Sequence, residues 1–157
     1  MKVLLIMIVV FGAVISVGVL FLVIVGFLRG MRRNKADDVT EKLSPEGILS
    51  FSPKENFFGQ KSKGPGQTRG NGVWTLTQKR LYFELYASDH VIDIPFESVT
   101  GTRKEKNFLG RSAPRDWLLV LEFTNDSGLP DECAWAFSDL ENQRKLIEQA
   151  AGIQRET

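Results

Sequence analysis

Charge is missing from the start of this chain of 157 residues. No charged side chain occurs between Val3 and Leu28, and all 19 Asp and Glu residues lie at or after Asp37. The uncharged stretch is longer than the roughly 20 apolar residues that cross a bilayer as a helix. The composition therefore excludes a simple soluble protein and predicts a transmembrane helix over residues 1–28.

Cysteine and histidine are nearly absent, since Cys133 and His90 are the single residues of their types. One thiol cannot form an intrachain disulfide, and the pair cannot supply the ligands of a Cys-rich or multi-histidine metal site. Gly64-Pro65-Gly66 and Gly70-Asn71-Gly72 lack the lysine and the strand-turn-helix setting of a phosphate-binding loop. The sequence predicts no cofactor, no metal and no enzymatic activity.

A secretory signal peptide is the alternative interpretation of residues 1–28. Its apolar region normally runs about 7–15 residues and ends in small residues, whereas this run is longer and ends in basic ones. Lys2 precedes the run, and four basic residues follow it: Arg29, Arg32, Arg33 and Lys35. The positive-inside rule then predicts an uncleaved single-pass helix, with the N-terminus outside and residues 36–157 in the cytoplasm.

The N-terminal segment also contains one candidate helix–helix contact. Gly12 and Ser16 lie four residues apart, and small residues at that spacing let two membrane helices approach closely. Glycine is also frequent in membrane helices generally, so both interpretations stay open. After the helix, residues 29–46 change from basic to acidic and offer little to bury apart from Val39 and Leu43. We expect a juxtamembrane linker there.

From Gly47 the apolar residues alternate with polar ones, which is typical of half-buried strands. Leu81, Phe83 and Leu85 share one face of a predicted strand, for example. The other expected strands cover 48–51, 73–77, 91–94, 99–104, 117–124 and the residues around 133–137. The glycine-rich stretch 54–71 is expected to be a long, mobile loop.

A helix is predicted after the last strand. Ser138 and Glu141 have the spacing of a capping box, with Ser138 at the N-cap. Seven strands followed by one helix predict an all-β domain over 47–152, a small antiparallel barrel or sandwich closed by the helix, with 153–157 as a tail.

Three segments resemble a known family. Residues 72–83 (GVWTLTQKRLYF) resemble the glycine, apolar strand, Thr and aromatic signature of GRAM and bacterial pleckstrin-homology-like domains, and 91–99 (VIDIPFESV) resemble the strand and corner that follow. The aromatic strand at 135–137 and the helix complete the pattern. The resemblance covers Gly47 to Gly152 and implies a pleckstrin-homology-like barrel. The helix lacks the Trp of eukaryotic pleckstrin-homology domains, which favours the GRAM-like or bacterial variant over a dedicated phosphoinositide reader.

Two basic segments are candidate contacts with an anionic membrane surface. The first contains Lys61, Lys63 and Arg69, and the second surrounds Phe108 and Leu109 with Arg103, Lys104, Lys106, Arg111 and Arg115. Cations around two apolar residues suit an anionic bilayer, although a solvated loop has the same composition. Five of the 20 Lys and Arg residues precede residue 36, so 15 face all 19 acidic residues in the remainder. That balance excludes a globally basic nucleic-acid binder.

The sequence therefore predicts a non-enzymatic, membrane-anchored binding or scaffold module. Its barrel would dock a protein partner or an anionic membrane surface. The alternative is an accessory or assembly subunit of a larger membrane protein complex, in which both the helix and the barrel make structural contacts.

Overall fold

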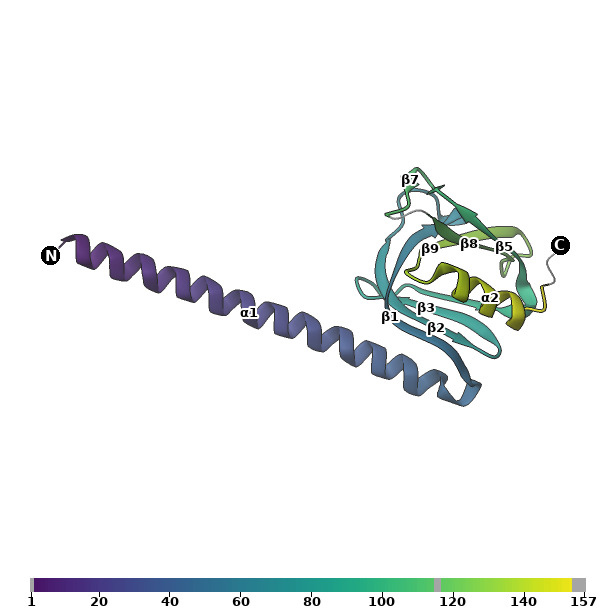
Figure 1. Ribbon diagram of the computed structural model, residues 1–157, viewed down its shortest axis with the longest axis horizontal. Coiled ribbons are helices and arrows are strands. Elements are labelled where there is room, and N and C mark those ends of the chain that lie inside the picture. The colour runs from purple at the N-terminus through teal and green to yellow at the C-terminus, as the bar shows by residue number, and fades with distance from the viewer. Residues whose placement is uncertain (1, 115–116, 154–157) are drawn as a thin grey trace. The chain divides into compact units, whose positions relative to one another are not determined.

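A computed structural model describes residues 2–114 and 117–153, with side chains described from residue 15 onward (Figure 1). The chain forms two compact units, residues 1–35 and 36–157. Arg115 and residues 154–157 lie outside the described residues, and Gly12 lies outside those with described side chains.

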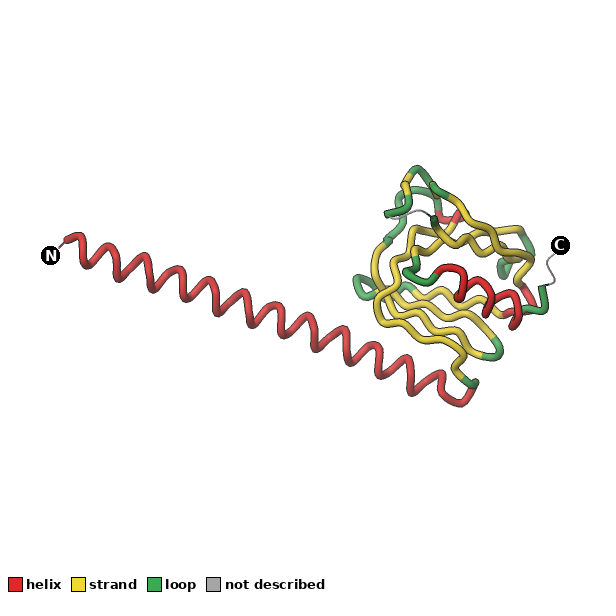
Figure 2. The backbone as a smooth tube through the Cα atoms, viewed as in Figure 1, coloured by secondary structure: helices red, strands yellow, loops and turns green. Residues whose placement is uncertain are grey.

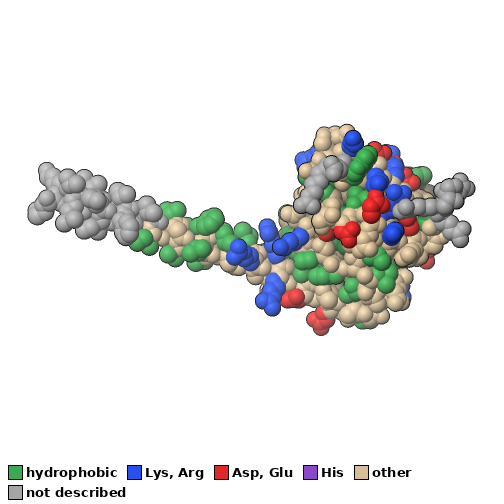
Figure 3. All heavy atoms as spheres, viewed as in Figure 1, with side chains coloured by type: hydrophobic (Ala, Val, Ile, Leu, Met, Phe, Trp, Pro, Cys, Tyr) green, Lys and Arg blue, Asp and Glu red, His purple; other side chains and the backbone are tan. Residues whose placement is uncertain are grey.

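The N-terminal unit is the first part of helix α1 (Lys2–Leu43). Its apolar side chains are exposed, as with Phe21 at 64% and Leu22 at 69%. Figure 3 shows these apolar side chains giving way to Lys and Arg further along the same helix. Within the described residues, α1 is the one helix long and apolar enough to cross a membrane. A signal sequence near an N-terminus has the same properties, so length and composition alone do not assign its role.

The C-terminal unit is a seven-stranded antiparallel sheet followed by a helix (Figures 1 and 2). The strand order is β4-β3-β2-β1-β9-β8-β5. The strands are β1 (Ile48–Gln60), β2 (Gly70–Thr77), β3 (Arg80–Leu85), β4 (Val91–Pro95), β5 (Val99–Glu105), β8 (Leu118–Thr124) and β9 (Pro130–Ala136). Two short strands, β6 (Asn107–Phe108) and β7 (Arg111–Ser112), form a separate hairpin, and α2 (Leu140–Ala150) closes the fold. The expected architecture of seven antiparallel strands closed by a C-terminal helix is confirmed.

The core lies between the two halves of the curled sheet and α2. Strand β1 belongs to both halves, because it pairs with β2 along most of its length and with β9 from Asn56 onward. The rings of Trp74 and Trp135 meet edge to face at 5.1 Å. Helix α2 contributes Ile147, which is fully buried, and Gln143, whose Oε1 accepts a hydrogen bond from Trp74 Nε1 at 3.2 Å.

The end of α1 corrects the expectation of a linker over 29–46. The helix continues to Leu43, and Ala36, Val39 and Leu43 pack against Val73 and Tyr82 on the outer face of the sheet. These three residues repeat at intervals of three and four, so one helical face is apolar although acidic residues lie between them. Residues 36–43 are therefore a docked helical segment of the domain.

The loop expected over 54–71 is shorter than predicted, because only residues 61–69 lie between β1 and β2. Strand β1 continues to Gln60, with irregular register between Ser52 and Glu55 and again at Gly59. Phe57 is 1% and Phe58 is 8% exposed, on opposite faces of the bent strand and in different apolar clusters. Because glycine and proline are typical of loops, the sequence pattern did not indicate that β1 extends into this stretch. The irregular register allows the strand to remain paired within the sheet.

Two local expectations at the second half of the sheet differ from the structure. The N-cap of α2 is Asp139 rather than Ser138 and makes no side-chain capping hydrogen bond, while Glu141 pairs with Lys104. Trp117, the first residue of the strand expected over 117–124, precedes β8 and is 41% exposed. In each case the boundary lies one residue later than the sequence pattern predicted.

Candidate functional site

The two basic segments meet at one end of the barrel. Phe58, beside the loop after β1, and Phe108, in the β6–β7 hairpin, belong to one apolar cluster. Arg69 at the end of the loop and Arg111 in the hairpin are close enough for their charges to interact. The packing of Phe58 against the cluster that contains Phe108 thus brings Arg69 near Arg111, which the sequence could not establish.

The loop between β1 and β2 is held by a network of hydrogen bonds. Gln67 Oε1 accepts from the Gln60 amide at 2.6 Å, and Gln67 Nε2 donates to the carbonyl of Gln60 at 2.7 Å. Asp131, only 2% exposed, accepts from Ser62 N at 2.9 Å and from Gln60 Nε2 at 2.6 Å. The loop that contains Lys61, Lys63 and Arg69 is therefore held in place by these hydrogen bonds.

Arg69 is the unusual cation of this end. Its Nε and Nη2 atoms are buried and have no hydrogen-bond partner among the described residues. The guanidinium lies close against Gly59, where a Cβ would come within 3.0 Å of Arg69 Nε. Burial, and secondarily the charge of Arg111, lowers the pKa of Arg69. Two like charges, one of them desolvated, favour the approach of an anion.

Three of the other candidate cations are already paired with carboxylates. Arg103 contacts Glu122, Glu132 at 2.7 Å and Glu105 at 3.1 Å. Burial opposes its charge, but these hydrogen bonds raise the pKa of Arg103 overall. Lys61 shares Glu132 at 2.7 Å, and Lys104 meets Glu141 at 2.6 Å. On the face that Figure 3 shows, acidic and basic side chains are accordingly interspersed.

The apolar pair of the second segment does not protrude as a membrane contact would require. Phe108 is 6% exposed, and Leu109, at a φ of 48°, is partly buried against the same cluster. The segment is a strand and a hairpin rather than a flexible loop. Lys106 Nζ lies 5.1 Å from the centre of the Trp117 ring, and Lys104 Nζ lies 5.8 Å from it. Lys63 and Arg111 are exposed.

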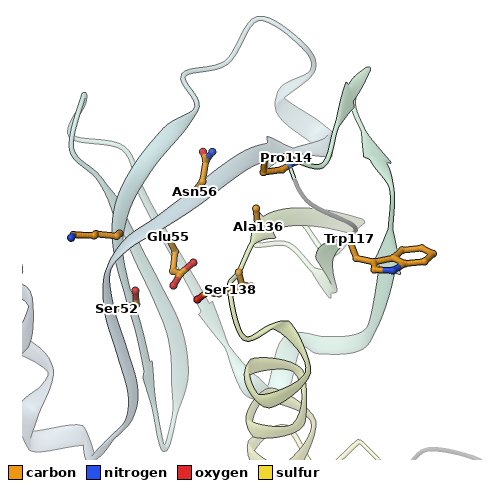
Figure 4. Close-up of a pocket in the computed structure, with 9 residues that line it drawn as sticks. Ser52, Glu55, Asn56, Pro114, Trp117, Ala136 and Ser138 are labelled. Carbon is orange, nitrogen blue, oxygen red and sulfur yellow. The ribbon is translucent and has the colours of Figure 1, made fainter.

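A hollow of about 480 Å³ lies between β1, the end of β9 and Trp117 (Figure 4). Ser52, Glu55 and Ser138 are directed into it. Burial raises the pKa of Glu55, offset in part by a hydrogen bond from Ser52. Besides this carboxyl and the two hydroxyl groups, the described lining contains the ammonium of Lys54 and the amide of Asn56, and neither histidine nor cysteine.

The residues with catalytic or ligating chemistry are scattered. Cys133 is fully buried, and burial raises the pKa of its thiol. The His90 ring lies 6.4 Å from that of Phe57. Over residues 2–114 and 117–153, no three His, Cys, Asp or Glu side chains gather in an arrangement that could hold a metal ion.

Comparison with solved structures shows the fold alone. One chain of "The 8S snRNP Assembly Intermediate" aligns with a TM-score of 0.51 and 13% identity, over 71% of this chain and 87% of that one. The C-terminal domain of an unknown protein from Leishmania infantum aligns with a TM-score of 0.49 and 12% identity, covering 82% and 97% of the two chains. The Vps36 N-terminal PH domain aligns with a TM-score of 0.48 and 17% identity, covering 67% and 78%. No family model and no curated protein sequence matches the chain.

Proposed function

We propose that this chain is a non-enzymatic binding module, anchored in a membrane by α1, whose basic end contacts an anionic membrane surface. The observation that carries the proposal is the pair of Arg69 and Arg111, one desolvated and the other exposed, without a carboxylate partner among the described residues. An anionic lipid headgroup would supply the opposite charge that this pair lacks. The GRAM-like assignment stays a prediction on the sequence resemblance.

The anchor supports the same function. Only residues 29–35 separate the apolar run of α1 from the compact unit that begins at Ala36. A domain on so short a connection has a high effective concentration at the bilayer, so even a weak contact would be occupied. The basic residues Arg29, Arg32, Arg33 and Lys35 predict that this bilayer side is the cytoplasmic one.

Cosedimentation with liposomes tests the contact. The fragment 36–157 is expected to bind vesicles that contain phosphatidylserine and not vesicles of phosphatidylcholine. Binding should weaken with salt, because the Debye length falls from about 30 Å at 0.01 M to about 8 Å at 0.15 M. The double variant Arg69→Gln, Arg111→Gln should lose most of the binding. The matched control Lys54→Gln, Lys145→Gln removes two exposed cations elsewhere and should retain it.

Equal binding by the two double variants would contradict the proposed site and leave only a general charge effect. No binding to either vesicle would favour the alternative of a protein partner or a larger complex. Native-gel migration of a mild-detergent extract then distinguishes a dedicated subunit, which should migrate with stoichiometric partners.

A further inference from the structure

Strand β4 forms one edge of the seven-stranded sheet and borders a cleft. The cleft has a volume of about 420 Å³. All five residues of β4 line it on one side, and Gln60, Lys63 and residues 123–126 lie on the others. The cleft thus follows the strand edge that has no neighbour in the sheet.

The register shows which main-chain groups of β4 face the cleft. The amide of Leu85 donates to the carbonyl of His90 at 3.2 Å, and that of Phe96 donates to the carbonyl of Lys79 at 3.0 Å. In an antiparallel pair such hydrogen-bonded positions alternate along the strand. Ile92 and Ile94 therefore bond to β3, opposite Phe83 and Leu81.

The N–H and C=O groups of Val91 and Asp93 consequently point away from β3, toward the free edge. Pro95 ends this edge, because it has no N–H and its carbonyl accepts from Ser98 Oγ at 2.8 Å. Val91 is 39% exposed, while Ile92 and Ile94 are buried beneath the strand. A strand added about 4.8 Å away could thus form main-chain hydrogen bonds with the N–H and C=O groups of two residues, Val91 and Asp93. The buried side chains of Ile92 and Ile94 lie on the core face of the same strand.

The charges around the cleft indicate what kind of strand would fit. Three carboxylates line it, those of Asp93, Glu97 and Asp126, against the single ammonium of Lys63. Asp93 is already paired with Arg80 at 2.8 Å, and the other two carboxylates have no ion pair with a described residue. A second copy of this chain would bring the same carboxylates to the edge and be repelled.

We propose that the free edge of β4 docks an extended, basic segment of a partner protein, which adds to the sheet as an eighth strand. Main-chain bonds at Val91 and Asp93 provide the pairing, and Lys or Arg side chains of the segment meet Glu97 and Asp126. The surface and the ligand chemistry both differ from those of the proposed lipid contact. Because only two residues offer free main-chain groups, the site suits weak, reversible binding.

The test uses the full chain in nonionic detergent and a labelled peptide of alternating lysine and valine, eight residues long. Binding is measured by fluorescence anisotropy, and amide hydrogen exchange is followed by NMR. The amides of Val91 and Asp93 should exchange at least about 5-fold more slowly with peptide, as expected for one new hydrogen bond each. Those of Ile92 and Ile94 should not change, since they are already bonded to β3.

Two variants test the cause. Val91→Pro removes an edge N–H that makes no bond to β3, and it should weaken peptide binding about 5-fold. Glu97→Gln with Asp126→Asn should weaken it about 5- to 20-fold at low salt, the range expected for two exposed ion pairs. The control pair Asp38→Asn, Asp139→Asn changes the net charge equally and should bind as the unmodified protein does.

Each contrary result overturns the proposal. Slowed exchange that does not alternate along β4, or equal binding of a glutamate–valine peptide, would show that the peptide does not pair with this edge. Protection of Val91 and Asp93 that rises with protein concentration in the absence of peptide would assign the edge to a second copy. Should Val91→Pro disturb the fold, the charge pair and its control still decide the matter.

Discussion

Truncation of Leu43 gives the most direct test of the docked segment 36–43. Leu43 is fully buried against the outer face of the sheet, where it packs with Val73 and Tyr82. Leu43→Ala removes three buried carbons and leaves a cavity, which costs about 2–4 kcal/mol of unfolding free energy at a site of this kind. Alanine is at least as good a helix former as leucine, so helix propensity cannot be the cause.

Urea unfolding of the full chain in nonionic detergent, followed by the fluorescence of the buried Trp74 and Trp135, measures the effect. With a slope of about 1.5–2 kcal/mol per molar urea for a domain of this size, the midpoint should fall by about 1–2.7 M. Phe51→Ala is the control, because Phe51 is 40% exposed and its loss should lower the midpoint much less. An unchanged midpoint for Leu43→Ala would refute the docking and restore the flexible linker.

Four further outcomes are expected. A fragment 44–157 should be less stable to urea than 36–157, since the apolar cover of Val73 is lost; equal midpoints would contradict this. Glu55→Gln should stabilise the protein at pH 7 and not below about pH 4. Burial raises the pKa of Glu55 in the folded state, so the folded protein is destabilised relative to the unfolded chain as pH rises through that pKa and the carboxyl ionises. Burial raises the pKa of Asp131, but its hydrogen bonds lower that pKa overall, so the stability that Asp131 contributes is present above about pH 4 and is lost as pH falls through the folded pKa. When the urea midpoint is plotted against pH, Asp131→Asn should therefore reduce the fall of the midpoint on the acid side. An unchanged acid side would argue against this role of Asp131. A reporter fused after Thr157 should be active only if it is a cytoplasmic one, and activity of a periplasmic reporter would reverse the topology.

The strands of the barrel could be predicted because their side chains alternate between core and surface. Leu81, Phe83 and Leu85 are fully buried, as their spacing indicated. The end of α1 was harder to predict, since a stripe of three apolar residues lies among acidic ones and is short enough to be taken for a linker. Its role depends on Val73 and Tyr82, which are distant in sequence.

The candidate site could be predicted only as a set of cations. Which of them are paired depends on register: Arg103 reaches Glu122 and Glu132 because β5, β8 and β9 lie side by side. Gly101 makes room for this, since a Cβ there would come within 2.6 Å of the Glu122 carboxylate. No periodicity in the sequence reports such a neighbour across strands. The burial of Arg69 is likewise a property of the assembled barrel.

The double role of β1 has a consequence for how the domain is made. Its first part can pair early with β2, which follows it closely in the chain, and β3 and β4 can add in order. Its last part pairs with β9, as in Asn56 with Ala136 and Gln60 with Cys133. Such distant pairing is slow because a long loop must close first. During synthesis, Phe57 and Phe58 therefore reach their full burial only after Trp135 and Ala134 of β9 have left the ribosome, and until then the second half of β1 exposes apolar surface that can aggregate.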